Sequence, residues 1–150
     1  MFNTSATMTA LQSHLMSTGK FLNVQIGEPK QVMDGDGFVA GIFMDKAGVI
    51  ELTLSTPVEL HVLTVRIYKN ALAEPQADWE IAGSDLFGSV ATLLYGDFTL
   101  GGAVRNIDFA GENGPKYTAE WTYGDVSGPI YRMIDITIPC VVDSTTAMVA

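Results

Sequence analysis

Few residues in this chain have the types and spacing that metal or phosphate chemistry requires. The run D-G-D-G at residues 34–37 resembles the opening of a calcium loop, in which carboxylates at alternate positions coordinate the ion. Such a loop also needs a bidentate glutamate at its twelfth position, but the residue there is Asp45, within a predicted strand. A plain turn is therefore the favoured interpretation of this run. We predict no metal site.

The residues that could support catalysis are scattered along the chain. His14 and His61 are the only histidines, and neither has a cysteine or carboxylate nearby at metal-ligand spacing. Ser84, Ser89 and Cys140 are candidate nucleophiles, but no G-x-S-x-G turn surrounds either serine. We therefore predict that the protein is not an enzyme.

The glycines at residues 96–102 are candidates for a shaped turn. The run L-G-G-A-V at 100–104 lacks the Lys-Ser/Thr of a phosphate-binding loop, so no cofactor is expected. A β-bulge or tight bend explains the pair Gly101-Gly102, with backbone angles that are closed to other residues.

Four polar residues within sheet-like runs are candidates for contacts between subunits: Arg66, Tyr68, Arg105 and Asp108. The spacing R-N-I-D places Arg105 and Asp108 on opposite faces of a strand, so these two cannot simply pair with each other. One interpretation is that such charges are only solvated. The other is that Arg66 and Arg105 meet carboxylates of a neighbouring subunit, where bidentate geometry would fix the register of a ring.

Composition predicts one compact domain over residues 1–150. The chain is 47% hydrophobic and could bury roughly 70% of the surface that its unfolded form exposes. Its longest apolar run is too short for a membrane span, and its N-terminus lacks the pattern of a signal peptide. Seventeen acidic residues against eight basic ones give a formal charge of −9, which disfavours binding to phosphate backbones. This charge is interpreted either as a solubilising surface or as the lining of a passage for DNA.

The elements that would position these residues follow from hydrophobic periodicity. Met8, Leu11 and Leu15 recur at helical spacing and predict a helix over 5–18, and a second apolar stripe predicts a helix over 78–95. Alternation predicts strands at 21–26, from 38 onward, at 58–69, 98–109, 116–124 and 129–142.

Together these elements predict an α+β fold with a mainly antiparallel sheet of five to six strands and two helices packed on one face. The strand from Phe38 is expected to be central because both of its faces are apolar. Residues 48–57 fit either an edge strand or the flank of a long excursion. Residues 143–150 are expected to be a mobile tail.

Several motifs, taken in order, carry a resemblance to a known family. They are E-P-K at 28–30, V-R-I-Y at 65–68, E-P at 74–75, Y-G-D-F-T-L-G-G-A-V-R-N-I-D-F at 95–109 and R-M-I-D-I-T-I-P at 132–139. Over residues 8–142 the order and spacing of these motifs resemble the tail terminator proteins of long, non-contractile-tailed (siphovirus-type) bacteriophages. Residues 33–57 depart from the pattern and do not align.

The resemblance implies a structural virion protein. Such a protein forms a homo-hexameric ring that caps the tail tube, stops its polymerisation and joins the tail to the head–tail connector protein, without a cofactor. DNA would pass through the ring without specific binding, and no membrane is involved. The expected location is the head-proximal end of the tail in the virion, after assembly in the host cytoplasm. The alternatives are a tail tube or other connector subunit, or a small ligand-binding or hydrolytic α+β protein.

Overall fold

The computed structural model describes residues 4–29, 38–51, 57–70, 76–125 and 130–143. Within these ranges the chain forms two helices, α1 (Thr4–Met16) and α2 (Gln76–Gly96). Its strands are β1 (Phe21–Ile26), β2 (Phe38–Glu51), β3 (Val58–Asn70), β4 (Asn106–Ile107), β5 (Thr118–Asp125) and β6 (Ile130–Asp143). The predicted D-G-D-G turn and the tail after residue 143 lie outside the described residues, so those two predictions stay as they are.

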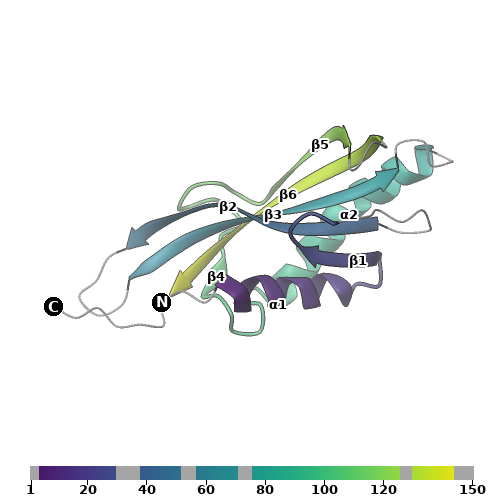
Figure 1. Ribbon diagram of the computed structural model, residues 1–150. Helices are drawn as coiled ribbons and strands as arrows, with labels where there is room; N and C mark the ends of the chain where they lie inside the picture. Colours follow the sequence, from purple (N-terminus) through teal and green to yellow (C-terminus); the bar gives the residue numbers. More distant parts are fainter. Residues whose placement is uncertain (1–3, 30–37, 52–56, 71–75, 126–129, 144–150) are drawn as a thin grey trace.

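The strands form one curled, mixed sheet, and the fold is α+β as predicted. Its order is β1-β2-β3-β6-β4, and β5 also pairs with β6. The long strands β2, β3 and β6 run side by side through the middle of the molecule, with β1 on one side of them and β5 on the other (Figure 1). The four pairings from β2 onward are antiparallel, but β1 runs parallel to β2. The alternation of polar and apolar residues does not encode strand direction, so the parallel pair was not foreseen.

The strand predicted over residues 98–109 is wrong for most of its length. Residues 97–105 form turns, and only the two residues of β4 pair with β6. Positive φ angles at Leu100 (50°), Gly101 (68°) and Gly102 (92°) explain the difference, because an extended strand cannot contain them. The prediction that Gly101 and Gly102 adopt angles closed to other residues is confirmed. Gly96, by contrast, is the last residue of α2 and has no positive φ.

The alternation predicted for the long strands is confirmed. In β6, Ile134, Ile136 and Ile138 are buried, while Asp135 and Thr137 between them are partly exposed. In β3, Leu63, Val65 and Ile67 are buried in the same way and pair in register with those isoleucines. We call the side of the sheet with these six residues the core face and the opposite side the open face.

The main hydrophobic core combines the core face with side chains from both helices. It contains Leu11 and Leu15 of α1, Leu86, Val90 and Leu94 of α2, and Ala40 and Ile42 of β2 beside the six core-face residues. The contact between α2 and the sheet is close at Gly83, where an added Cβ would lie 2.9 Å from Cδ1 of Ile134. The strand expected to be central, β2, lies second in the sheet, and β3 holds the middle position.

Candidate functional site

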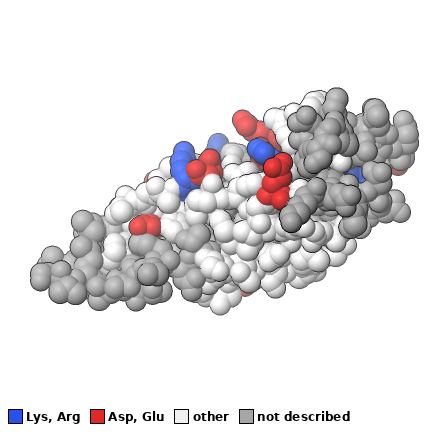
Figure 2. Space-filling model, viewed as in Figure 1, with Lys and Arg blue, Asp and Glu red and all other residues white. Residues whose placement is uncertain are grey.

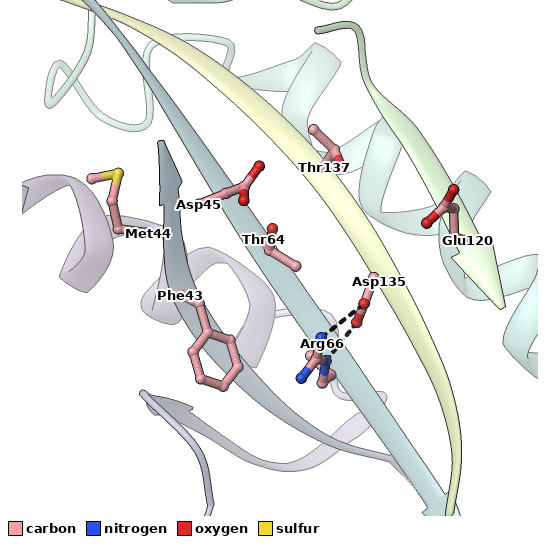
Figure 3. A pocket seen from close by; sticks show the side chains of 8 residues that line it. All are labelled: Phe43, Met44, Asp45, Thr64, Arg66, Glu120, Asp135 and Thr137. Atoms are coloured by element: carbon pink, nitrogen blue, oxygen red, sulfur yellow. Dashed lines mark hydrogen bonds and ion pairs between the residues drawn. The ribbon is translucent and has the colours of Figure 1, made fainter. Parts of the chain in front are cut away.

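The open face carries a shallow depression of about 390 Å³ at its centre. Its lining comes from four strands and includes Phe43 and Asp45 of β2, Thr64 and Arg66 of β3, Glu120 of β5, and Asp135 of β6 (Figure 3). These side chains lie together because the strands pair in register, so that residues far apart in sequence share one row across the sheet. Gly41, Arg66, Asp135 and Glu120 form one such row.

The centre of this depression is a bidentate ion pair between Arg66 and Asp135. Nε of Arg66 donates to Oδ1 of Asp135 at 2.8 Å, and Nη2 donates to Oδ2 at 3.0 Å. The guanidinium also lies 5.6 Å from the centroid of the Phe43 ring, within cation–π range. The hydrogen bonds to Asp135 raise the pKa of Arg66 above its ordinary value, and the partial burial of the guanidinium acts in the opposite direction. Arg66 is therefore held in place by its own chain.

Because Gly41 has no side chain, the segment Gly27–Pro29 can cross the open face beside this row. A Cβ at Gly41 would lie 2.5 Å from the carbonyl oxygen of Gly27 and 3.3 Å from Cδ of Pro29. The segment Gly27–Pro29 therefore closes over β2 at this point, and Pro29 is buried there. A larger residue at 41 would have to push this segment away from the sheet.

The depression is acidic overall. Three carboxylates, from Asp45, Glu120 and Asp135, face one guanidinium. Among the described residues, neither Asp45 nor Glu120 forms an ion pair. Charged side chains also gather on the upper side of the molecule, over the strands, whereas the lower side in the same view is nearly uncharged (Figure 2). The negatively charged depression would attract cationic groups and repel phosphates.

Tyr68 occupies the open face next to this site but is only 1% exposed. Its ring meets that of Tyr131 edge to face, with centroids 6.4 Å apart. Burial raises the pKa of the Tyr68 hydroxyl, and the nearby positive charge of Arg66 opposes that shift. Within the described part of the chain, no group makes a hydrogen bond of good geometry with this hydroxyl. The Tyr68 side chain is therefore packed inside the protein beside Arg66.

The other two predicted interface residues lie around β4, away from the depression. Arg105 is exposed and forms a bidentate pair with Asp143, through contacts of 3.1 Å (Nε) and 2.5 Å (Nη2). Asp108 is buried, and its carboxylate accepts hydrogen bonds from the backbone N–H groups of Glu112 (3.0 Å) and Asn113 (2.9 Å). The structure thus brings Arg66 and Tyr68 together, and places Arg105 and Asp108 elsewhere. A role for these four residues between subunits stays a prediction.

The described contacts of the candidate nucleophiles are with backbone carbonyl oxygens and, for Ser89, also with the ammonium of Lys20 at 2.8 Å. Cys140 lies opposite His61 in the β3–β6 register, but it is fully buried and its thiol contacts the carbonyl oxygen of Ile138. Burial raises the pKa of the Cys140 thiol to about 12, the reverse of what a nucleophile needs. The hydroxyls of Ser84 and Ser89 donate to carbonyl oxygens one turn earlier in α2. These contacts favour structural roles for all three residues.

Two histidine contacts were missed in the sequence. Nε2 of His14 lies 2.8 Å from Oδ2 of Asp97, and Nε2 of His61 lies 2.6 Å from Oε1 of Glu59. Glu59 could have been found, because it is two residues before His61 on the same side of a predicted strand. Asp97 could not, because 83 residues separate it from His14.

In the described ranges, no three His, Cys, Asp or Glu side chains are grouped to hold a metal ion. No helix there is long and apolar enough to cross a membrane. No protein-family model matches the chain, and no curated protein shows a significant match to it.

Proposed function

We propose that this protein is a structural virion protein, the tail terminator of a siphovirus-type bacteriophage. It assembles as a homo-hexameric ring at the head-proximal end of the tail. There it caps the tail tube, stops tube polymerisation and binds the head–tail connector. In this proposal the protein is not an enzyme and uses no cofactor.

The observation that supports this proposal best is that three of the family-like motifs, E-P-K, V-R-I-Y and R-M-I-D-I-T-I-P, meet at one place on the sheet. V-R-I-Y of β3 and R-M-I-D-I-T-I-P of β6 are register partners, and Arg66 of the first motif holds Asp135 of the second. Gly27–Pro29, which includes the start of E-P-K, closes over the same face at Gly41. Motifs that are distant in sequence therefore lie side by side around the Arg66–Asp135 pair.

The finer architecture belongs to the same proposal. A terminator-like subunit has a mainly antiparallel sheet with both helices against one face. The shared core of Leu11, Leu15, Leu86, Val90 and Leu94 with the core face supports this arrangement. It leaves the polar centre of the open face, around Arg66 and Asp135, available for contacts with other subunits.

The net negative charge of the chain supports a ring through which DNA passes without binding to the protein. The formal charge is −9, and two of the acidic residues, Asp45 and Glu120, line the depression without an ion pair among the described residues. Binding to DNA is driven by lysine and arginine, which release counterions from phosphates. An acidic ring would instead let the DNA slide past.

Native mass spectrometry over a concentration series tests this proposal. A closed ring predicts a species of about 97 kDa, six times the 16.1 kDa subunit, without larger polymers. Open-ended polymers would instead identify a tail tube subunit. A single subunit at every soluble concentration would contradict a ring that closes on its own.

A charge swap separates an intersubunit role of Arg66 from its role within the chain. Arg66→Glu should weaken the ring while the monomer stays folded by circular dichroism. The double variant Arg66→Asp with Asp135→Arg restores an ion pair within the subunit but reverses the charge offered to a neighbour. If it restores the hexamer fully, Arg66 acts only inside its own chain.

Arg132→Glu is the matched control for this experiment. Arg132 also forms an ion pair within the chain, with Glu80 of α2 at 3.2 Å, but it does not line the depression. Its reversal should leave the ring intact. Equal losses of hexamer in Arg66→Glu and Arg132→Glu would mean that the effect is general repulsion rather than a specific contact. Arg105→Glu tests the second predicted contact, and unchanged assembly in both Arg66→Glu and Arg105→Glu would contradict the assignment.

A further inference from the structure

The side chain of His14 connects the end of α1 to the turn that follows α2. Its Nδ1 lies 2.7 Å from the carbonyl oxygen of Ala10, and its Nε2 lies 2.8 Å from Oδ2 of Asp97. The ring is half-buried, and the Asp97 side chain is 38% exposed. Both contacts have the distances of good hydrogen bonds.

These contacts define the number of protons on the ring. A carbonyl oxygen and a carboxylate are both acceptors, so each ring nitrogen must donate. A neutral imidazole carries only one N–H and can make only one of the two bonds. The geometry therefore fits the doubly protonated, positively charged form of His14.

The positions of the two residues favour opposite charges at this point. His14 lies in the last turn of α1, where the helix dipole stabilises a cation. Asp97 follows the last residue of α2, where the same effect disfavours an isolated anion. The cation of His14 therefore compensates a carboxylate in an unfavourable place.

Asp97 in turn organises the residues that follow it. Its Oδ2 accepts a hydrogen bond from the N–H of Gly101 at 2.8 Å, and its Oδ1 accepts one from the Thr99 hydroxyl at 3.1 Å. This is the segment in which Leu100, Gly101 and Gly102 all have positive φ angles. The same oxygen of Asp97 thus contacts both His14 and the most unusual backbone of the described chain.

We propose that His14 and Asp97 form a proton-dependent latch between α1 and the α2–β4 turn. The latch is closed while His14 carries both ring protons and Asp97 is ionised. Loss of one ring proton removes one of the two hydrogen bonds and the attraction to Asp97. The proposal does not depend on the function proposed above.

The surroundings of His14 contain few other charges. α1 and β1 have no Asp, Glu, Lys or Arg. The ammonium of Lys20 donates to the hydroxyl of Ser89 at 2.8 Å. The acidic residues of α2 lie in its first half, and Asp85, the last of them, is roughly 18 Å along the helix from Asp97 at 1.5 Å per residue. Asp97 is therefore the charge that His14 contacts.

The pH range of the latch follows from the two groups. The hydrogen bond from His14 lowers the pKa of Asp97, so the latch persists at pH values below the ordinary range of aspartate titration and opens when Asp97 is protonated. On the alkaline side the latch opens when the ring of His14 gives up one of its two protons. The turn should thus be held most firmly at mildly acidic pH.

NMR of the full chain tests this latch directly. Ring ¹⁵N spectra should show two protonated nitrogens on His14 at pH 5.5, with the ring of His61 as an internal comparison. Between pH 5.5 and 8, the exchange protection of the Gly101 amide should fall by about two- to fivefold after correction for intrinsic exchange, as expected for a partly exposed ion pair. The Gly111 amide, which donates to the carbonyl oxygen of Asp108 in another positive-φ turn, should keep its protection.

Two variants complete the experiment. His14→Gln retains one donor but does not titrate, so the protection of Gly101 should become independent of pH. Asp97→Asn removes the carboxylate, so the protection of Gly101 should also lose its pH dependence. A single ring proton on His14 at pH 5.5 would overturn the proposal. So would the same pH dependence of Gly101 protection in the wild-type chain and in His14→Gln.

Discussion

Neighbouring residues of the central strands lie in opposite environments on the two faces of the sheet. Val65 and Ile136 are a register pair on the core face, and both are 0% exposed. Arg66 and Asp135 are the next pair along, on the open face, and their side chains are 37% and 22% exposed. The same two backbones therefore carry a hydrophobic contact on one side and an ion pair on the other.

The difference teaches which contacts stabilise the folded protein. Full burial of one aliphatic side chain contributes about 1.5–3 kcal/mol, whereas a partly exposed ion pair contributes about 0–1 kcal/mol. The core face therefore contributes most of the stability at this point of the sheet, and the partly exposed residues Arg66 and Asp135 can change with little loss.

The largest contrast is expected from truncating one residue on each face. Ile136→Ala should lower the free energy of unfolding by about 2–5 kcal/mol, because it leaves a cavity in the core. Thr137→Ala, its neighbour on the open face, should change this value by less than about 0.5 kcal/mol. Urea denaturation followed by circular dichroism measures both. Similar losses in the two variants would mean that the open face is also packed against something.

The thiol of Cys140 tests the burial of the core face without a mutation. Burial raises its pKa from 9.0 to about 12, which corresponds to about a thousandfold less thiolate at neutral pH. Native protein should therefore react far more slowly with a thiol reagent than urea-unfolded protein. The folded state keeps the proton, so stability should also fall as the pH rises above 9. Rapid native labelling would contradict a closed core.

Gly83 and Gly88 lie on different sides of α2. Gly83 is buried against the sheet, and Gly88 is exposed on the outer side. Nothing lies within 4 Å of a Cβ added at Gly88, so Gly88→Ala should stabilise the protein by about 0.5–1 kcal/mol through helix propensity. At Gly83 the added Cβ would lie 2.9 Å from Ile134, so Gly83→Ala should lose this gain and cost about 1–3 kcal/mol relative to Gly88→Ala. Thermal unfolding of the two variants, measured in parallel, provides the difference. Equal gains would show that α2 lies farther from β6.

The smallest effect is expected at the ion pair of the open face. Arg66→Gln and Asp135→Asn should each cost less than about 1 kcal/mol, because both side chains reach solvent. The double variant should cost little more than either single one, since the pair is already broken. High salt should reduce the difference from wild type. A loss of several kcal/mol in either single variant would show that the pair is buried more deeply than its exposure indicates.

Sequence patterns were informative where structure is decided locally. The alternation from Ile134 to Ile138 placed three isoleucines on one face and Asp135 and Thr137 on the other, as the structure has them. Both helices were predicted within a few residues of their observed bounds. These features depend on side chains two to four positions apart, so a single segment contains the information.

The same patterns failed where the local structure depends on unusual backbone angles or on residues distant in sequence. Residues 98–109 alternate like a strand, but the run from Leu100 to Gly102 turns the chain before β4. The glycines were recognised as a bend, yet their effect on the whole segment depends on Asp97, which holds the turn together. The parallel pairing of β1 with β2 was likewise invisible, because alternation is identical for either direction.

The sequence by itself determined the α+β class, the two helices and the two-sided character of β3 and β6, because periodicity fixes which side chains can be buried together. Only the tertiary structure decided that Arg66 meets Asp135, 69 residues away, and that Asp45 and Glu120 join them in one depression. It also decided that His14 meets Asp97. Such contacts depend on strand order, register and helix placement, which arise from the packing of the whole chain rather than from any one segment.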